Sequence, residues 1–138
     1  MEANRSVVWR VLLETERYDD WNSVVSSVAG RVAPEEHLRL ALRALPLLGV
    51  PVQILSRFEE LRLRWAFALL HRGCVSVEGT LGLSDEPGGR TRARALLSFR
   101  GVLVNAVFPF VASAVEAGQE QFLADLAARS ARVMLADA

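Results

Sequence analysis

The sequence of 138 residues contains no lysine and a single cysteine. All 16 basic residues are arginine, which excludes Schiff-base catalysis by a lysine side chain. Cys74 has no second cysteine to pair with, so neither an intrachain disulfide nor a CxxC redox motif can form. The 16 basic and 16 acidic residues cancel. A neutral chain without a basic stripe gives no support for a nucleic-acid partner.

The sequence also lacks an apolar run long enough to span a membrane. Its most apolar window, residues 102–115, is interrupted by Asn105 and Pro109 and is shorter than the ~20 residues that a spanning helix needs. Residues 1–8 have no apolar core of the kind found in signal peptides. We therefore expect a cytoplasmic protein with no stable membrane insertion. The length, and the absence of linkers or repeats, predict a single domain over residues 1–138.

Few residues are suited to catalysis or metal binding. His37 and His71 lie far apart in the chain with no acidic cluster beside them, so the sequence predicts no metal site. His71 could act as a base for Cys74, but a small buried or half-buried thiol is the favoured interpretation. Glu78 alternates with apolar neighbours and is interpreted as a surface carboxylate. We predict no catalytic residue and no cofactor.

The last third of the chain has the pattern of one long amphipathic helix, residues 108–135. Apolar or small residues recur there in steps of three and four on one face: Val111, Val115, Gly118, Phe122, Leu126 and Val133. The opposite flank is polar: Glu116, Gln119, Glu120, Arg129 and Arg132. Pro109 suits a first turn, so the helix is expected to begin between Asn105 and Pro109. About 27 residues give roughly 40 Å of helix, which only a wide, curved surface can cover.

The preceding part of the chain predicts two helical segments and then about six strands. The helical segments are residues 6–16, capped by Asn4 or Ser6, and residues 18–22. The strands alternate between apolar and polar residues: 23–28, 36–44, 52–56, 61–68, 75–83 and 91–99. Pro46, Gly49 and Pro51 are expected to break the chain between the second and third strands. One apolar face per strand is typical of an antiparallel meander, so the fold class is α+β.

Several short motifs resemble the START-like SRPBCC superfamily, which includes polyketide cyclase/dehydrase and lipid-transport proteins. They are Val8-Trp9-Arg10-Val11-Leu12, Tyr18, Trp21-Asn22, Gly30, Leu63-Arg64-Trp65, Gly88-Gly89-Arg90-Thr91-Arg92, Phe99-Arg100-Gly101 and the helix around residues 118–126. The resemblance covers nearly the whole chain. It implies a helix-grip fold, in which a curved antiparallel sheet wraps around a long C-terminal helix and encloses a hydrophobic cavity.

The sequence departs from this family pattern in two places. Relatives usually begin with a strand before the first helix, whereas only residues 1–3 stand there in this chain, so the first strand is predicted to be largely missing. Its absence would expose the sheet edge beside residues 91–99, where a second copy could pair to form a homodimer. Many relatives also carry an acidic residue at the position of Leu97, which argues against borrowing their polar catalysis.

The inward strand residues and the apolar stripe of the long helix form the predicted ligand-binding lining. These residues are Leu40, Leu42, Ile54, Leu63, Trp65, Phe67, Val77, Ala95, Leu97, Phe99, Val111, Val115, Gly118 and Phe122. Such a lining selects an apolar ligand by shape and burial, at roughly 25 cal/mol per Å² removed from water. The outward residues include Arg62, Arg64, Arg92, Arg94 and Arg100. We interpret that face as solvated rather than as a surface for lipid headgroups.

The favoured hypothesis is therefore a carrier of a small hydrophobic molecule, such as a lipid, an isoprenoid or an aromatic polyketide. A polyketide cyclase/dehydrase-like enzyme or hydrolase is an alternative, in which Thr91, Trp65, Asn105 or Cys74 would orient the substrate. A third hypothesis is an interaction module whose core is filled and which uses its outer sheet face or its open edge. The three differ in whether the space between helix and sheet is open, and in whether polar groups face it.

Overall fold

The computed structural model describes residues 1–43, 45–69, 75–101 and 104–137. Within these ranges, side chains are described except at residues 45–49, 69, 75, 104–112 and 137. His71 and Cys74 lie outside the described residues, and so does the side chain of Asn105. The interpretations of these three residues therefore stay predictions.

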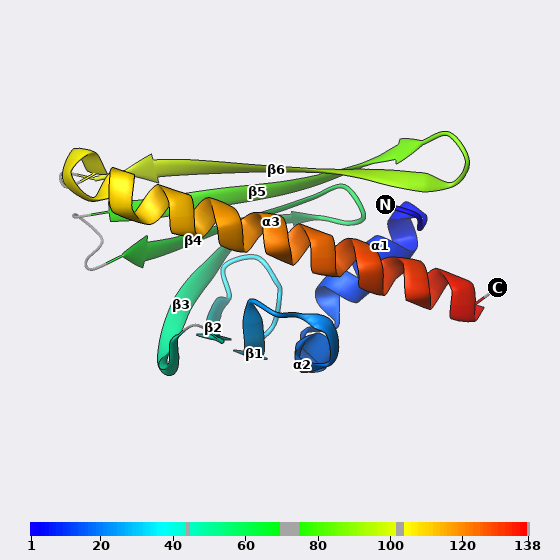
Figure 1. The fold of residues 1–138 in the computed structure, drawn as a ribbon, viewed down its shortest axis with the longest axis horizontal. Coiled ribbons are helices and arrows are strands. Elements are labelled where there is room, and N and C mark those ends of the chain that lie inside the picture. The colour runs from blue at the N-terminus through cyan, green and yellow to red at the C-terminus, as the bar shows by residue number, and fades with distance from the viewer. Residues whose placement is uncertain (44, 70–74, 102–103, 138) are drawn as a thin grey trace.

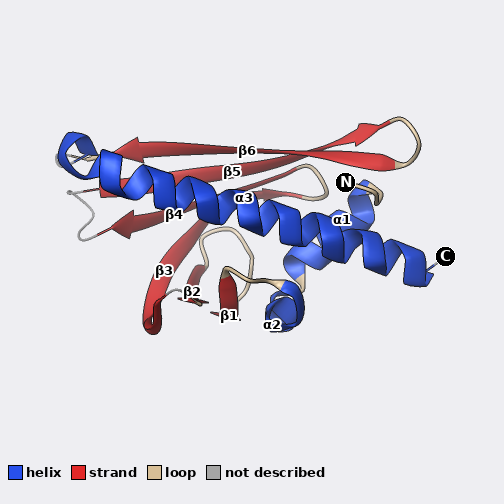
Figure 2. Cartoon of the chain, viewed as in Figure 1, coloured by secondary structure: helices blue, strands red, loops and turns tan. Residues whose placement is uncertain are grey.

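Six antiparallel strands form one curved sheet, and each strand pairs with its neighbour in the chain, in the order β1-β2-β3-β4-β5-β6. The strands are β1 (Val25–Ala29), β2 (His37–Leu42), β3 (Leu45–Phe58), β4 (Arg62–Leu69), β5 (Val75–Glu86) and β6 (Arg90–Arg100). Figure 1 shows the sheet curling from β6 down to β1 around one long helix, and Figure 2 shows the separation of strands and helices. The predicted α+β meander is confirmed.

The long helix α3 extends over Val104–Asp137 and contains 34 residues. At 1.5 Å per residue its length is about 50 Å, and it crosses the whole sheet (Figure 1). It begins slightly earlier than predicted, so Pro109 lies beyond the first turn. Proline has no N–H to donate to the carbonyl four residues earlier. The helix continues past that missing hydrogen bond because many apolar and helix-favouring residues follow Pro109.

The third strand is longer than the sequence predicted, because β3 continues through Pro46, Gly49 and Pro51. Gly49 pairs with Ala41 and Pro51 with Arg39 on β2. The pairing of β3 with β4 begins only at Val52. Among the described residues, the pairs before Val52 are with β2 alone, and a strand tolerates proline where its missing N–H is not needed for the ladder. The expected chain break is wrong for this physical reason.

The first helix, α1, spans Arg5–Leu13 and closes one end of the sheet. Asn4 caps it, since its side-chain oxygen accepts a hydrogen bond from the backbone N–H of Val7 at 3.0 Å. The indole N–H of Trp9 donates to Glu59 at 2.8 Å, which attaches α1 to the turn between β3 and β4. The helix ends earlier than predicted and is followed by a 3-10 turn, η1 (Thr15–Arg17), and by the short helix α2 (Tyr18–Trp21).

The residues before α1 pair with the start of β6. The amino group of Met1 donates to the carbonyl of Thr91 at 2.6 Å, and the N–H of Thr91 donates to the carbonyl of Met1 at 3.0 Å. The buried hydroxyl of Thr91 also donates to the carbonyl of Ala3 at 2.8 Å. These bonds cover only the first residues of β6, in agreement with a first strand that is largely missing.

Candidate functional site

The concave face of the sheet brings most of the predicted strand residues together in rows. One row contains Ile54, Trp65, Gly79 and Leu97, which are paired across β3, β4, β5 and β6. The next row contains Phe67, Val77 and Phe99. Residues paired directly in an antiparallel sheet point to the same face. The register therefore places these predicted site residues on one apolar surface.

A third row lies toward α1 and is tightly packed. It pairs Leu63 with Leu81 and Leu81 with Ala95. Leu63 and Leu81, together with Ile54, belong to one buried cluster that includes Val8 and Leu12 of α1 and Leu126 of α3. Ile54 and Leu63 were predicted to line the ligand site. Neighbouring side chains of the protein already cover both of them, at 2% and 8% exposure.

The other end of the concave face is more accessible. Large apolar side chains of the inner face remain only half-buried there: Leu40, Leu42, Trp65, Phe67, Leu97 and Phe99. Val77 is the exception in this region, because it lies between Phe67 and Phe99 and is fully buried. Burial thus decreases along the strands as they leave α1.

Some of the predicted site residues on α3 face a neighbouring segment of the chain rather than the sheet alone. Val115, Gly118 and Phe122 are half-buried, while the side chain of Val111 lies outside the described residues. A Cβ at Gly118 would lie 3.8 Å from the side chain of Val24. The ring of Phe122 packs edge-on against Tyr18 and Trp21, with centroid distances of 6.0 and 5.9 Å. Gly118 and Phe122 therefore face the segment between α2 and β1.

A polar contact fixes α3 to that same segment. The carboxylate of Asp125 accepts from the backbone N–H of Ser23 at 2.9 Å and from its hydroxyl at 2.6 Å. The side-chain amide of Gln121 donates to the second oxygen at 2.9 Å. Desolvation raises the pKa of Asp125, but the hydrogen bonds from Ser23 and Gln121 outweigh it and hold the pKa below its ordinary value. The ionised carboxylate thus keeps the middle of α3 in place.

Gln119 does not lie on the polar flank to which the sequence assigned it. Its side chain is half-buried, and its amide oxygen is buried without a hydrogen-bond partner among the described residues. The signal was present in the sequence, because Val115, Gln119, Phe122 and Leu126 follow one another in steps of four, three and four. That spacing places all four on one helical stripe. Because glutamine is polar, Gln119 was assigned to the solvent-facing flank although its spacing matches the apolar stripe.

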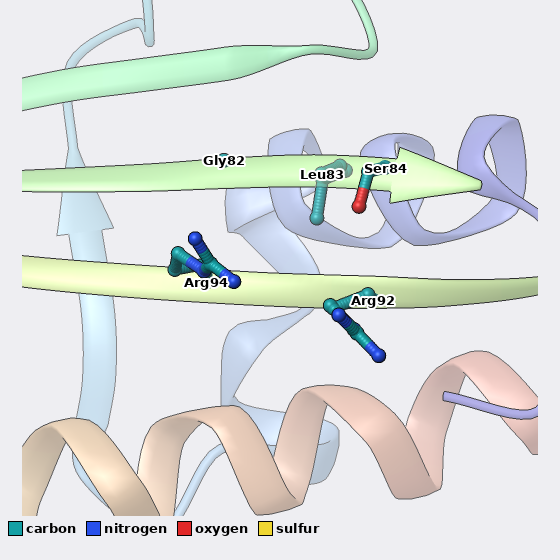
Figure 3. A pocket seen from close by; sticks show the side chains of 5 residues that line it. All are labelled: Gly82, Leu83, Ser84, Arg92 and Arg94. Atoms are coloured by element: carbon teal, nitrogen blue, oxygen red, sulfur yellow. The ribbon is translucent and has the colours of Figure 1, made fainter. Parts of the chain in front are cut away.

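The outer face of the sheet carries the arginines, as predicted. Arg62, Arg92, Arg94 and Arg100 are exposed, while Arg64 is half-buried and lies 3.6 Å from Glu78. A depression of about 280 Å³ lies on this face, and Figure 3 shows the residues that line it: Gly82, Leu83, Ser84, Arg92 and Arg94. Arg92 donates to Glu86 at 2.7 Å. The depression is lined partly by arginine side chains and lies on the face opposite α3, so it is distinct from the apolar inner face.

The concave face offers little for acid–base chemistry. The inner positions of β4 and β6 are apolar except for Thr91, whose fully buried hydroxyl is bound to Ala3. Thr91 is thus unable to orient a substrate, contrary to the enzyme hypothesis. His37 is exposed on the other face of β2. Within the described ranges, no three His, Cys, Asp or Glu side chains cluster closely enough to hold a metal ion.

The sequence profile of one protein family, described as polyketide cyclase / dehydrase and lipid transport, matches residues 2–131. The chain belongs to this SRPBCC-type family. No curated protein matches the sequence. The match covers both the sheet and α3, and it agrees with the motifs from which the resemblance was inferred.

Solved structures with the same helix-grip fold cover nearly the whole chain. Hypothetical protein jhp0584 from Helicobacter pylori has a TM-score of 0.74 and 15% identity, and the alignment covers 93% of this chain and 81% of that one. TTHA0849 from Thermus thermophilus has a TM-score of 0.69 and 21% identity, with coverages of 96% and 93%. CalU16 from Micromonospora echinospora has a TM-score of 0.60 and 17% identity, with coverages of 99% and 82%. At these identities the similarity establishes the fold alone.

Over the part of the chain that the structure describes, no helix is both long enough and apolar enough to cross a bilayer.

Proposed function

We propose that this family member binds and carries a small hydrophobic molecule in a site between α3 and the concave face of the sheet. The ligand class is a lipid, an isoprenoid or an aromatic polyketide. The proposed lining is the accessible end of the concave face, chiefly Trp65, Phe67, Leu97 and Phe99, together with Val115 of α3. Ile54, Leu63 and Val77 support this surface from below.

One observation carries the proposal. Large apolar side chains at one end of the inner face are only half-buried, on the sheet that α3 crosses (Figure 1). The same face is tightly packed at the end where α1 lies, with Leu81 at 2% and Leu83 at 5% exposure. Apolar side chains left accessible in a concave site gain free energy when a ligand removes them from water, at roughly 25 cal/mol per Å². Small-molecule sites are usually lined by apolar and aromatic side chains, which is the composition of this face.

The composition of the lining favours carriage over catalysis. A general acid or base must lie within hydrogen-bond reach of the reacting atom, and the inner positions of β4 and β6 have no ionisable side chain. The family description includes cyclases and dehydrases as well as lipid-transport proteins. The apolar residues described on this face favour a lipid-transport role.

Native mass spectrometry of the freshly purified protein tests the proposal directly. We expect a stoichiometric adduct of a small molecule, which solvent extraction and mass analysis would then assign to a chemical class. Protein stripped of this adduct should bind the neutral fluorescent probe N-phenyl-1-naphthylamine with an increase in its emission. A bare chain mass, with no probe binding and no thermal shift across a panel of lipids and aromatic compounds, would favour the filled-core interaction module.

Two further expectations complete the proposal. The carrier is expected to act in the cytoplasm, where apolar metabolites need a protein to keep them dispersed. A homodimer through the edge of β6 is expected because, among the described residues, the backbone bonds from Met1 reach only Thr91, and an unpaired edge can pair with a second copy. Light scattering at high concentration measures the fraction of dimer.

A further inference from the structure

The stripe of α3 that faces the interior contains one polar residue beside the proposed ligand site. Val115, Gln119, Phe122 and Leu126 share this stripe by their spacing. Leu126 is fully buried in the packed cluster, whereas Val115 and Phe122 are half-buried. Gln119 therefore lies between the half-buried and the fully buried part of this stripe, beside the contacts of α3 with residues 18–24.

The amide oxygen of Gln119 is buried and has no donor among the described residues. Its polar neighbours on α3 do not satisfy it. Glu116 and Glu120 are exposed, and Gln121 donates to Asp125. Buried acceptors in native proteins are almost always paired, so an unpaired one calls for a partner that is absent from the chain itself.

The segment that packs against this part of α3 holds an unpaired donor. Val24 contacts the position of Gly118, and Ser23 bonds to Asp125, so residues 22–24 lie along the same part of the helix. Asn22 is 1% exposed. Its side-chain oxygen accepts from the backbone N–H groups of Val24 and Val25 at 2.9 and 2.8 Å, which fixes the orientation of the amide. Its nitrogen is buried without an acceptor among the residues that the structure describes.

These unpaired groups limit the chemistry of the ligand. A charged ligand would need an opposite charge in the site, and the inner positions of β4 and β6 supply none. A hydroxyl group is neutral and can both donate and accept a hydrogen bond. It therefore suits a buried amide in either of its two orientations.

We propose that Gln119 is the polar contact of the ligand site, and that the ligand is a neutral hydrophobic molecule with a hydroxyl group that donates to this side chain. This inference rests on the proposed carrier function and specifies its ligand class. The hydroxyl lies at the α3 side of the ligand, and the apolar body packs against Trp65, Phe67 and Leu97. The side-chain nitrogen of Asn22 is a second donor, from which a ligand hydroxyl can accept a hydrogen bond.

Two probes of nearly equal shape test the proposal. 2-Naphthol carries a hydroxyl group where 2-methylnaphthalene carries a methyl group, and both are measured by displacement of N-phenyl-1-naphthylamine from stripped protein. In the variant Gln119→Met, which keeps the length of the side chain, we expect the affinity for 2-naphthol to fall about tenfold, the usual effect of one lost buried hydrogen bond. The affinity for 2-methylnaphthalene should stay within about twofold, because its contacts are apolar.

The control is Glu120→Met, which makes the same new residue at the adjacent exposed position of α3. It should change neither affinity. If Gln119→Met leaves 2-naphthol binding intact, or weakens both probes equally, the hydroxyl contact is overturned while the carrier function stands. If the unaltered protein binds neither probe nor N-phenyl-1-naphthylamine, the proposed carrier function itself is overturned.

Discussion

The indole ring of Trp65 occupies the space above Gly79, the residue paired with it on the neighbouring strand. A Cβ at Gly79 would lie 2.3 Å from Cε2 of that ring and 2.6 Å from its nitrogen. Only glycine permits this contact, because no larger residue avoids the clash. The ring is held against the sheet, which leaves the adjacent Leu97 accessible in the same row. The position of the Trp65 ring thus depends on the absence of a side chain at residue 79.

The first prediction follows from that contact. We expect Gly79→Ala to push the Trp65 ring toward α3, to lower the free energy of unfolding by about 1–3 kcal/mol through overpacking, and to weaken probe binding. Chemical denaturation and titration with N-phenyl-1-naphthylamine measure the two effects. Gly82→Ala is the matched control on the same strand, since the nearest atoms to its Cβ lie 3.9 Å away. Equal effects of both changes would show that the ring contact is unimportant.

A second prediction separates the two faces of β6. Leu97 is half-buried on the concave face, whereas its neighbour Leu96 is 65% exposed on the outer face. We expect Leu97→Trp to weaken the binding of N-phenyl-1-naphthylamine about tenfold or more, because the indole fills the space of the ligand. Leu96→Trp should leave binding within about twofold. Circular dichroism checks that both variants fold, and unchanged affinity in a folded Leu97→Trp would exclude this position from the site.

A third prediction concerns the attachment of α3. Replacing Asp125 with alanine removes the hydrogen bonds from Ser23 and Gln121, and we expect a loss of about 1 kcal/mol of stability at pH 7, a small value because the contact is solvent-exposed. Since the pKa of Asp125 is lower in the folded state, its contribution is complete above the unfolded pKa of about 3.9. It is lost as the pH falls through the lower, folded value.

The measurement is the free energy of unfolding from urea titrations across pH 2–7, compared between Asp125→Ala and the unaltered protein. The difference should shrink toward zero at the acid end. Glu120→Ala, an exposed carboxylate on the same helix, should show no such dependence. A constant difference at every pH would mean that the charge of Asp125 has no part in the contact.

The fourth prediction tests the pairing of the chain start with β6. Thr91→Val keeps the shape of the side chain but removes the hydroxyl that donates to the carbonyl of Ala3. We expect a loss of about 1–2 kcal/mol, because the side chain is fully buried and the carbonyl loses its donor. Hydrogen exchange should become faster at Thr91, whose N–H bonds to Met1. Thr80→Val, on the outer face of β5 and half-buried, is the control and should have little effect.

The strand order and the face of each strand could be predicted from the sequence alone. Alternation of apolar and polar residues is a local property, so the inward positions of Trp65, Leu97 and Phe99 are readable from a few neighbours. The long helix was equally readable from its apolar stripe. Cross-strand partners were not readable, because Gly79 and Trp65 lie on different strands, whose relative register no local pattern determines.

Tertiary structure alone decided which part of the inner face is accessible. All of its apolar residues have the same sequence signature, yet α1 covers Leu63 and Leu81 and leaves Trp65 and Phe67 half-buried. Burial depends on what packs above a residue, and that neighbour can come from anywhere in the chain. The sequence by itself determined an α+β helix-grip domain with an apolar interior. The position of α1 decided which part of that interior is most deeply buried.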